Sequence, residues 1–278
     1  MMALVYHGTP VSPLTALRAL GPRAFCISFE ARSRRSAPHV ERQSPFVMYD
    51  NGEFARYTAA KRGGTEDLRA DWRPFFDWLN SRLFEPGRWA VIPDVIDAGS
   101  QMQDALIAEW PFGHRGAPVW HTDEPLDRLL RLIDEWPRVC FGSSGEHWQV
   151  GGPDWTARMD EVWGILGRRR HVPVIHMLRG VAVANRYPFD SADSTGFAQS
   201  MHRYRQPLFA GTPDEWTGIV AFADRLEKRA ASRRLLLSPA AAKTNRDRER
   251  LVISPGPLTL AEGAPVRDLL TYARVGNQ

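Results

Sequence analysis

The feature that most constrains the fold is a repeated alternation of short, β-rich apolar runs with longer polar, helix-periodic segments. Strands that alternate with helices in this way predict βαβ units and a parallel sheet. Eight runs are found: LVYHG (4–8), AFCIS (24–28), FVMYD (46–50), WAVIPD (89–94), APVWH (117–121), RVCFG (138–142), VPVIHML (172–178) and YPFDSAD (187–193). Eight units close a barrel, a fold that takes about 250 residues. The sequence therefore predicts an α/β fold, a TIM-type (β/α)8 barrel.

Helical segments are expected between the strands, at residues 66–82, 99–110, 124–135 and 154–168. We expect the barrel to form a catalytic domain over residues 1–205. The composition then changes: residues 214–237 predict an arginine-rich amphipathic helix, and several prolines follow it. Residues 206–278 are therefore predicted to be a C-terminal helical and irregular appendage packed on the barrel.

Composition narrows the class of protein. No apolar run approaches the roughly 20 residues that span a bilayer, and no export signal opens the chain, so we expect a cytoplasmic protein that has no membrane partner. Cys26 and Cys140 each lie in an apolar run, where cysteine usually packs as a small hydrophobe. No disulfide framework, metal or cofactor is predicted, and the oligomeric state is left open.

The formal net charge of +4 is unevenly distributed. One cluster comprises Arg32, Arg34 and Arg35. A second lies near the C-terminus and contains Arg225, Arg229, Arg233 and Arg234. Such surfaces attract DNA or RNA, because each neutralised phosphate releases counterions. A solvated helical face explains the same charges about equally well.

The carboxyl ends of the predicted strands collect polar side chains, and barrel enzymes place their chemistry at this end. Three strand ends supply aspartates, which can divide the roles of nucleophile and proton carrier when they converge. The candidates are Asp50 with Asn51, Asp94, His176 with Arg179, and Asp190 with Asp193. Each one taken singly is more often a helix cap or turn residue. Positions 190 and 193 face opposite sides of an extended strand, so only one of them should point into the mouth.

A glycine- and serine-rich turn, FGSSGEH (141–147), follows the sixth run. Gly142, Ser144 and Glu146 are candidate ligand contacts, because such a turn can bring backbone N–H groups close to a phosphate or a flat base. The turn lacks the lysine of a P-loop and the spacing of a dinucleotide-binding loop.

Taken in order, these motifs resemble the tRNA-guanine transglycosylase superfamily and its DNA-acting relatives, which include phage-defence glycosylases of modified bases. YDNGEF is similar to the family's D-S-G-G-F segment, which implies that Asp50 handles a proton. GSSGE is similar to the base-recognition loop. PFDSADST is similar to the F-D-x-V segment that carries the nucleophile, which implies Asp190, with Asp193 as the rival. Asp94 would correspond to the residue that contacts the edge of the base.

The resemblance implies a DNA glycosylase that cleaves the N-glycosidic bond of a modified base, flipped into the barrel mouth, in defence against phages with modified DNA. The alternative is a transglycosylase that inserts a 7-deazaguanine-type base into DNA or tRNA. The chain lacks the family's cysteine-rich zinc subdomain, which favours DNA over tRNA as partner. Flipping exposes a base to carboxylates that can stabilise an oxocarbenium-like sugar.

Three further interpretations stay open. A barrel without chemistry could bind nucleic acid through its basic segment. YHGTP (6–10) is similar to the H-G-T of ADP-ribosyltransferases, although that fold lacks eight alternating units. A metal-dependent hydrolase would use His7, His121 and His176 at strand ends.

Overall fold

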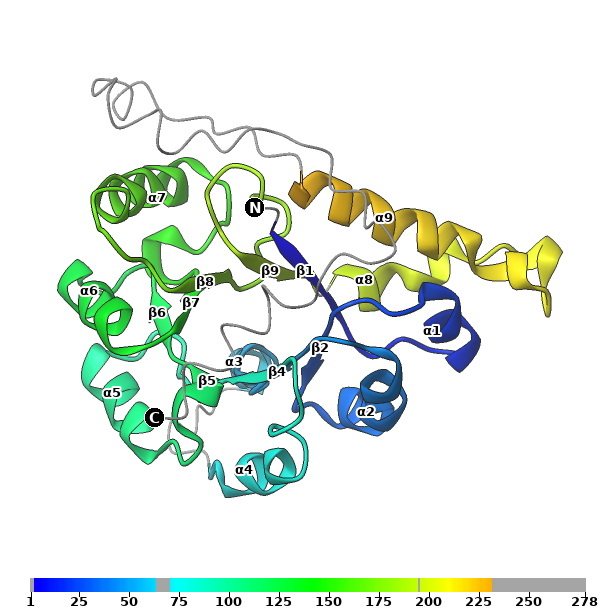
Figure 1. Cartoon of the computed structure of the whole chain (residues 1–278), viewed down its shortest axis with the longest axis horizontal. Coiled ribbons are helices and arrows are strands. Elements are labelled where there is room, and N and C mark those ends of the chain that lie inside the picture. Colours follow the sequence, from blue (N-terminus) through cyan, green and yellow to red (C-terminus); the bar gives the residue numbers. More distant parts are fainter. Residues whose placement is uncertain (1–2, 64–70, 195, 232–278) are drawn as a thin grey trace.

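A computed structural model describes residues 3–63, 71–194 and 196–231. It confirms the predicted barrel: parallel strands form the centre and helices surround them (Figure 1). The order around the sheet is β5-β4-β3-β2-β1-β9-β8-β7-β6. The strands are β1 (Leu4–Gly8), β2 (Phe25–Ser28), β3 (Val47–Asp50), β4 (Arg88–Val91), β5 (Gly116–Ala117), β6 (Val119–His121), β7 (Arg138–Gly142), β8 (Val174–Met177) and β9 (Ser191–Ser194).

Nine strand segments fill eight positions, because β5 and β6 are two halves of one predicted strand. Pro118 separates them and has no N–H to donate to a neighbour. Ala117 pairs with Val91 of β4, and Val119 pairs with Cys140 of β7. The continuous segment of β5, Pro118 and β6 therefore links β4 to β7, and the ring of strands is nearly closed.

Side chains alternate between the interior of the barrel and the helical layer, as the two-residue period of a strand requires. Tyr6, Cys26, Met48, Trp89 and Cys140 belong to one buried cluster inside the barrel. The alternate residues of the same strands pack outward, against two larger apolar clusters under the helices. This alternation decides which polar residue at each strand end can reach the mouth.

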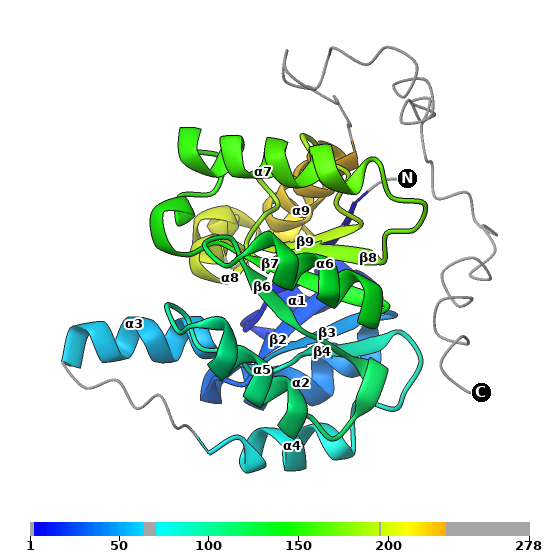
Figure 2. The same ribbon diagram turned by 90° about the vertical axis from the view of Figure 1, so that its left-hand side faces the viewer.

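The helices of the outer layer are α1 (Leu14–Leu20), α2 (Ala31–Gln43), α3 (Glu53–Gly63), α4 (Arg73–Asn80), α5 (Ser100–Glu109), α6 (Leu126–Glu135), α7 (Pro153–Leu166), α8 (Gly196–Ser200) and α9 (Thr217–Ala231). Three of the four predicted helices are confirmed as α5, α6 and α7. The fourth, over 66–82, is α4 where the structure describes it. Figure 2 shows α3 projecting from the end of the barrel at which the strands terminate. No helix in the described ranges is long and apolar enough to cross a membrane.

Helix α9 lies beyond the predicted boundary at residue 205 and packs closely on the barrel. Ile219 and Ala223 of α9 are buried in the cluster that also contains Leu17 of α1, and Ala230 joins the cluster of Val5. Helix α9 thus covers β1 as part of the barrel's own helical layer (Figure 1). The rest of the predicted appendage, residues 232–278, lies outside the described residues.

Candidate active site

Asp193 is the aspartate that β9 points into the mouth. Strand β9 begins at Ser191, so Asp193 shares the inward face with Ser191 and pairs in register with Tyr6 of β1. Its carboxylate is buried, and Oδ1 accepts a hydrogen bond of 2.6 Å from the N–H of Arg179. The Nε2 atom of His176 lies 3.3 Å from the same oxygen. No described residue donates to Oδ2, which is therefore the oxygen available to a substrate.

His176 is the buried side chain that contacts Asp193. Its ring is fully buried, and Nδ1 lies 2.8 Å from the hydroxyl of Ser191. Burial lowers the pKa of His176, and this effect outweighs the opposing effect of Asp193. A neutral ring that carries its proton on Nε2 donates to Asp193 and accepts from Ser191. This residue positions the carboxylate.

Asp50 ends β3 and faces the same mouth. The N–H of Gly52 donates to its Oδ2 at 3.1 Å, and the hydroxyl of Ser28 on β2 also hydrogen-bonds the carboxyl. Burial raises the pKa of Asp50 to about 7, and the nearby carboxylates of Asp193 and Asp94 add to the shift. The sequence-predicted pair of carboxyls, Asp50 with Asp193, is therefore close enough to interact.

Asp94 follows β4 and forms a buried charged pair with His121 of β6. Its Oδ2 lies 3.0 Å from Nε2 of His121, and its Oδ1 accepts 2.7 Å from Nδ2 of Asn51. Asn51 also donates to the carbonyl of Ile92, at 3.0 Å. Burial alone would lower the pKa of His121, but the contact with Asp94 raises it above its ordinary value. Asn51 thus ties the ends of β3 and β4 together.

Glu53 is a buried acid of the mouth that the sequence interpretation missed. It begins α3, accepts bonds of 2.6 and 2.9 Å from Arg56, and accepts 3.3 Å from the N–H of Ile96. Burial raises its pKa to about 7, with a further contribution from Asp94 and against the effect of Arg56. The only sequence signal for a role of Glu53 was its position directly after the D-N-G turn of residues 50–52.

Arg179 connects the end of β8 with α3. Its guanidinium carbon lies 3.8 Å from the centre of the Phe54 ring, and that ring is 44% exposed. Its backbone has a φ of 57°, in the left-handed region that non-glycine residues rarely adopt. Burial lowers the pKa of the guanidinium, against the attraction of Asp193. A strained residue that contacts a candidate catalytic group is a candidate functional position.

The prediction that Asp190 could face the mouth is wrong. Asp190 precedes β9, and its Oδ2 accepts a 2.8 Å bond from the N–H of Ile175, near the start of β8. It therefore lies at the amino end of the barrel. The predicted run of 187–193 began too early, because the extended segment starts only at Ser191.

The glycine-serine turn does not form an open cradle. Ser144 is buried: its N–H donates 3.2 Å to the hydroxyl of Thr122, and its own hydroxyl donates to Asp123. Gly142 ends β7, where a Cβ atom would come within 3.2 Å of Nδ1 of His121. The side chain of Glu146 is 81% exposed and lies 3.5 Å from Nε2 of His147, apart from the buried aspartates.

The remaining candidates are spread over the molecule. His7 faces outward, where its Nε2 lies 2.8 Å from Glu227 of α9, so the three strand-end histidines do not converge. Among the described residues, no group of three or more His, Cys, Asp or Glu side chains could hold a metal ion. Arg225 and Arg229 are exposed on the outer wall, and Arg233 and Arg234 lie outside the described residues.

The fold and the mouth define a (β/α)8-type barrel with convergent carboxyls at the carboxyl ends of its strands. No family model matches the sequence, and neither a curated protein nor a solved structure shows significant similarity to it.

Proposed function

We propose that the chain is a DNA glycosylase, which cleaves the N-glycosidic bond of a base held in the barrel mouth. The observation that carries the proposal is the proximity of Asp50 to Asp193, with the pKa of Asp50 raised to about 7. Glycosidic cleavage needs one carboxylate beside the anomeric carbon and a second group that is protonated near neutral pH. Asp193 suits the first role and Asp50 the second.

In the first step the bond between C1′ and the base nitrogen breaks, and its electron pair leaves with the base. Asp50 gives its proton to the base, while the Asp193 carboxylate stabilises the sugar cation or bonds to C1′. Asp50, now ionised, then takes a proton from a water molecule whose oxygen bonds to C1′. Where Asp193 has bonded to C1′, that bond breaks as the water attacks, and its electron pair returns to the Asp193 carboxylate. The products are a free base and an abasic sugar, and Asp50 ends protonated as it began.

Several neighbours support a flipped base as the substrate. Phe54 offers an exposed aromatic ring beside Arg179, on which a base can stack. The Asp94–His121 pair and Asn51, which contacts Asp94, are candidates for the edge of the base. With the basic surface, these features support DNA that carries a modified base, and defence against phages is the role we propose.

The test is to incubate the purified protein with DNAs carrying different modified bases and to measure released base and abasic sites by mass spectrometry. Asp50→Asn and Asp193→Asn should each slow release by at least about a hundredfold, because both keep the shape but remove the carboxylate. Asp190→Asn is the matched control and should release base at nearly the parental rate. If the Asp50 and Asp193 variants both match the parent, the proposal is wrong.

The same experiment separates the two main alternatives. Incorporation of an added 7-deazaguanine-type base would identify a transglycosylase, since exchange shares the first step. Tight DNA binding without release from any substrate would identify a non-catalytic barrel.

A further inference from the structure

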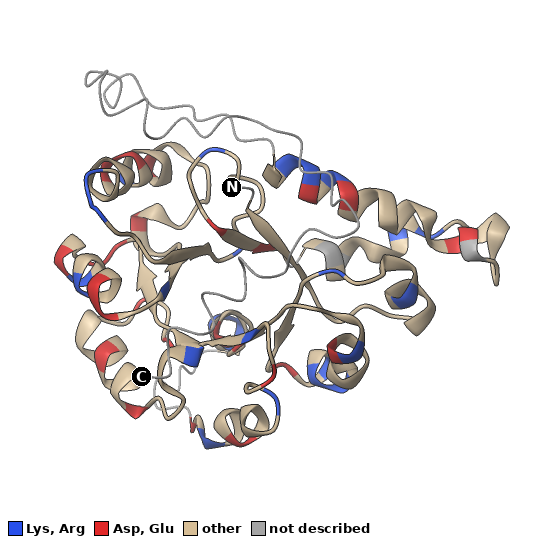
Figure 3. Ribbon diagram, viewed as in Figure 1, with Lys and Arg blue, Asp and Glu red and all other residues tan. Residues whose placement is uncertain are grey.

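The outer face of α2 carries positive charge that the described structure leaves largely uncompensated. The helix holds Arg32, Arg34, Arg35 and Arg42 and a single acid, Glu41. Glu30 caps its start, where the carboxylate accepts from the N–H groups of Arg32 and Ser33. All four arginines are exposed. Glu41 faces the barrel instead, where it accepts from the hydroxyl of Tyr49 and lies 3.2 Å from Nε of Arg82. Figure 3 shows this concentration of basic residues on α2.

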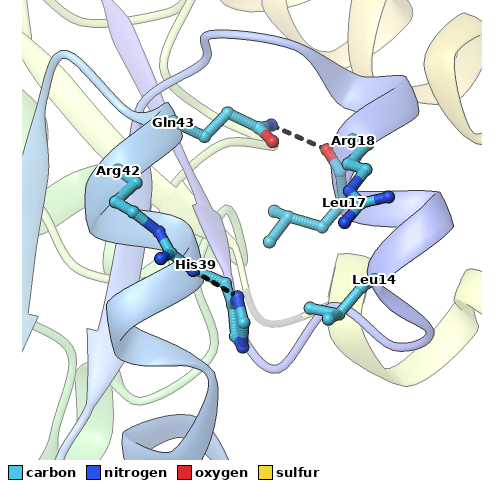
Figure 4. A pocket seen from close by; sticks show the side chains of 6 residues that line it. All are labelled: Leu14, Leu17, Arg18, His39, Arg42 and Gln43. Carbon is cyan, nitrogen blue, oxygen red and sulfur yellow. Dashed lines mark hydrogen bonds between the residues drawn. The ribbon is translucent and has the colours of Figure 1, made fainter.

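A hollow of about 390 Å³ lies between α2 and α1 and extends this charge. It is lined by Leu14, Leu17, Arg18, His39, Arg42 and Gln43 (Figure 4). Nη2 of Arg42 lies 2.8 Å from Nδ1 of His39, and the guanidinium of Arg18 has no acidic partner among the described residues. The hollow therefore presents two arginines above an apolar floor.

The walls of this hollow are fixed before any ligand arrives. The side-chain amide of Gln43 donates to the carbonyls of Leu17 and Gly21, at 2.7 and 2.6 Å, and so ties α2 to α1. Fixed walls lower the entropy that binding must overcome.

The strip of arginines begins at the rim of the mouth. Helix α2 starts at Ala31, three residues after Ser28, whose hydroxyl contacts Asp50. From Arg32 to Arg42 the helix rises about 15 Å, which spans several phosphates of one nucleic-acid strand. The exposed guanidinium groups can each bind a phosphate through two parallel hydrogen bonds.

We infer that Arg18, Arg32, Arg34, Arg35 and Arg42, here named the α1–α2 strip, form the docking surface for the phosphate backbone of DNA. The strand that flanks the base in the mouth runs over the rim and along this wall. The assignment of the base to the mouth rests on the proposed function. The sequence analysis gave the cluster of Arg32, Arg34 and Arg35 and the C-terminal cluster as two surfaces that attract nucleic acid, and the present inference selects the first.

The first test measures binding of the full chain to an unmodified duplex by fluorescence anisotropy between 50 and 200 mM salt. Arg18→Glu/Arg42→Glu should weaken binding at least tenfold and reduce the salt slope by about two, one for each lost phosphate contact. The matched control is Arg168→Glu/Arg170→Glu, the same charge change at exposed arginines after α7. The control should stay within about twofold of the parent.

An equal loss in both variants, or no loss in the strip variant, overturns the inference. Displacement of the bound DNA by poly-glutamate at equal charge also overturns the inference, because it would indicate an acidic protein partner. Circular dichroism checks folding, and Arg32→Gln/Arg35→Gln, at exposed positions, replaces the first variant if that one fails to fold. This second variant must also weaken binding.

A cross-linking experiment then locates the strand. Cys26 and Cys140 are both buried, so a cysteine introduced at position 42 or 168 can be labelled selectively with a photo-cross-linker. DNA should cross-link from position 42 and not from position 168. Cross-links from both or only from 168 contradict the inference. Since these readouts use unmodified DNA, failure to release any base would overturn the proposed function without altering them.

Discussion

At the scale of single residues, the proposed chemistry depends on how much the surroundings of the two aspartates of the mouth differ. Asp193 accepts from a backbone N–H and lies against the ring of His176. Asp50 accepts hydrogen bonds from the N–H of Gly52 and the hydroxyl of Ser28, and it lies near the carboxylate of Asp193. The environment, and not the residue type, therefore assigns the roles of charge stabiliser and proton carrier.

The raised pKa of Asp50 predicts how stability depends on pH. Its pKa rises from 3.8 to about 7 on folding, so the unfolded chain loses this proton at a lower pH than the folded chain does. Stability that is present at low pH is then lost as pH rises through this window. Asp50→Asn should match the parent near pH 4 and exceed its free energy of unfolding at pH 8 by about 1 to 3 kcal/mol, allowing for partial exposure.

Urea unfolding at the two pH values measures this difference. Asp190→Asn, at the opposite end of the barrel, is the matched carboxyl-to-amide control: a gain at pH 8 that both variants share would not come from the Asp50 carboxyl. A parental stability for Asp50→Asn at both pH values would mean that the carboxyl titrates normally.

At the scale of elements, the turn after β8 is constrained in three ways. Arg179 combines a positive φ, an N–H bonded to Asp193 and a stacked guanidinium. Arg179→Gly removes the side chain but suits the backbone, whereas Arg179→Ala keeps the strain. We expect the glycine variant to be more stable than the alanine variant by about 1 kcal/mol.

Thermal unfolding compares the two variants directly. In the proposed reaction both variants should bind and cleave DNA poorly, because both lack the guanidinium beside Phe54. Equal stability would show that the left-handed backbone costs nothing here.

At the scale of the whole molecule, the barrel includes a helix that composition had assigned to an appendage. Helix α9 buries Ile219 and Ala223, and Glu227 pairs with both His7 and Arg23. A chain cut at residue 205 would expose the apolar wall beneath α9. We expect residues 1–205 to lose cooperative thermal unfolding, while residues 1–231, the matched control, keep it.

Circular dichroism at far- and near-ultraviolet wavelengths follows both truncations. A cooperative transition for residues 1–205 would show that the barrel is complete without α9 and restore the predicted boundary.

The local pattern of residues is enough to predict the architecture, because each buried strand must be apolar, short and bounded by turns. It also placed Asp50, Asn51, Asp94 and His176 at strand ends, and the two-residue period required that only one of Asp190 and Asp193 face inward. Local periodicity carries this information. The periodic signal is weaker for α1, which has only seven residues, and for α2, whose interior Pro38 opposes a helix prediction.

Which of the two aspartates faces inward follows from strand pairing, because the register of β9 is set by its pairing with β1 and β8. The same holds for the burial of Glu53, the closed turn at Ser144 and the meeting of α1 with α2. Each depends on contacts between segments far apart along the chain. Strand pairing and helix packing fix those contacts, and the local pattern of residues does not encode them.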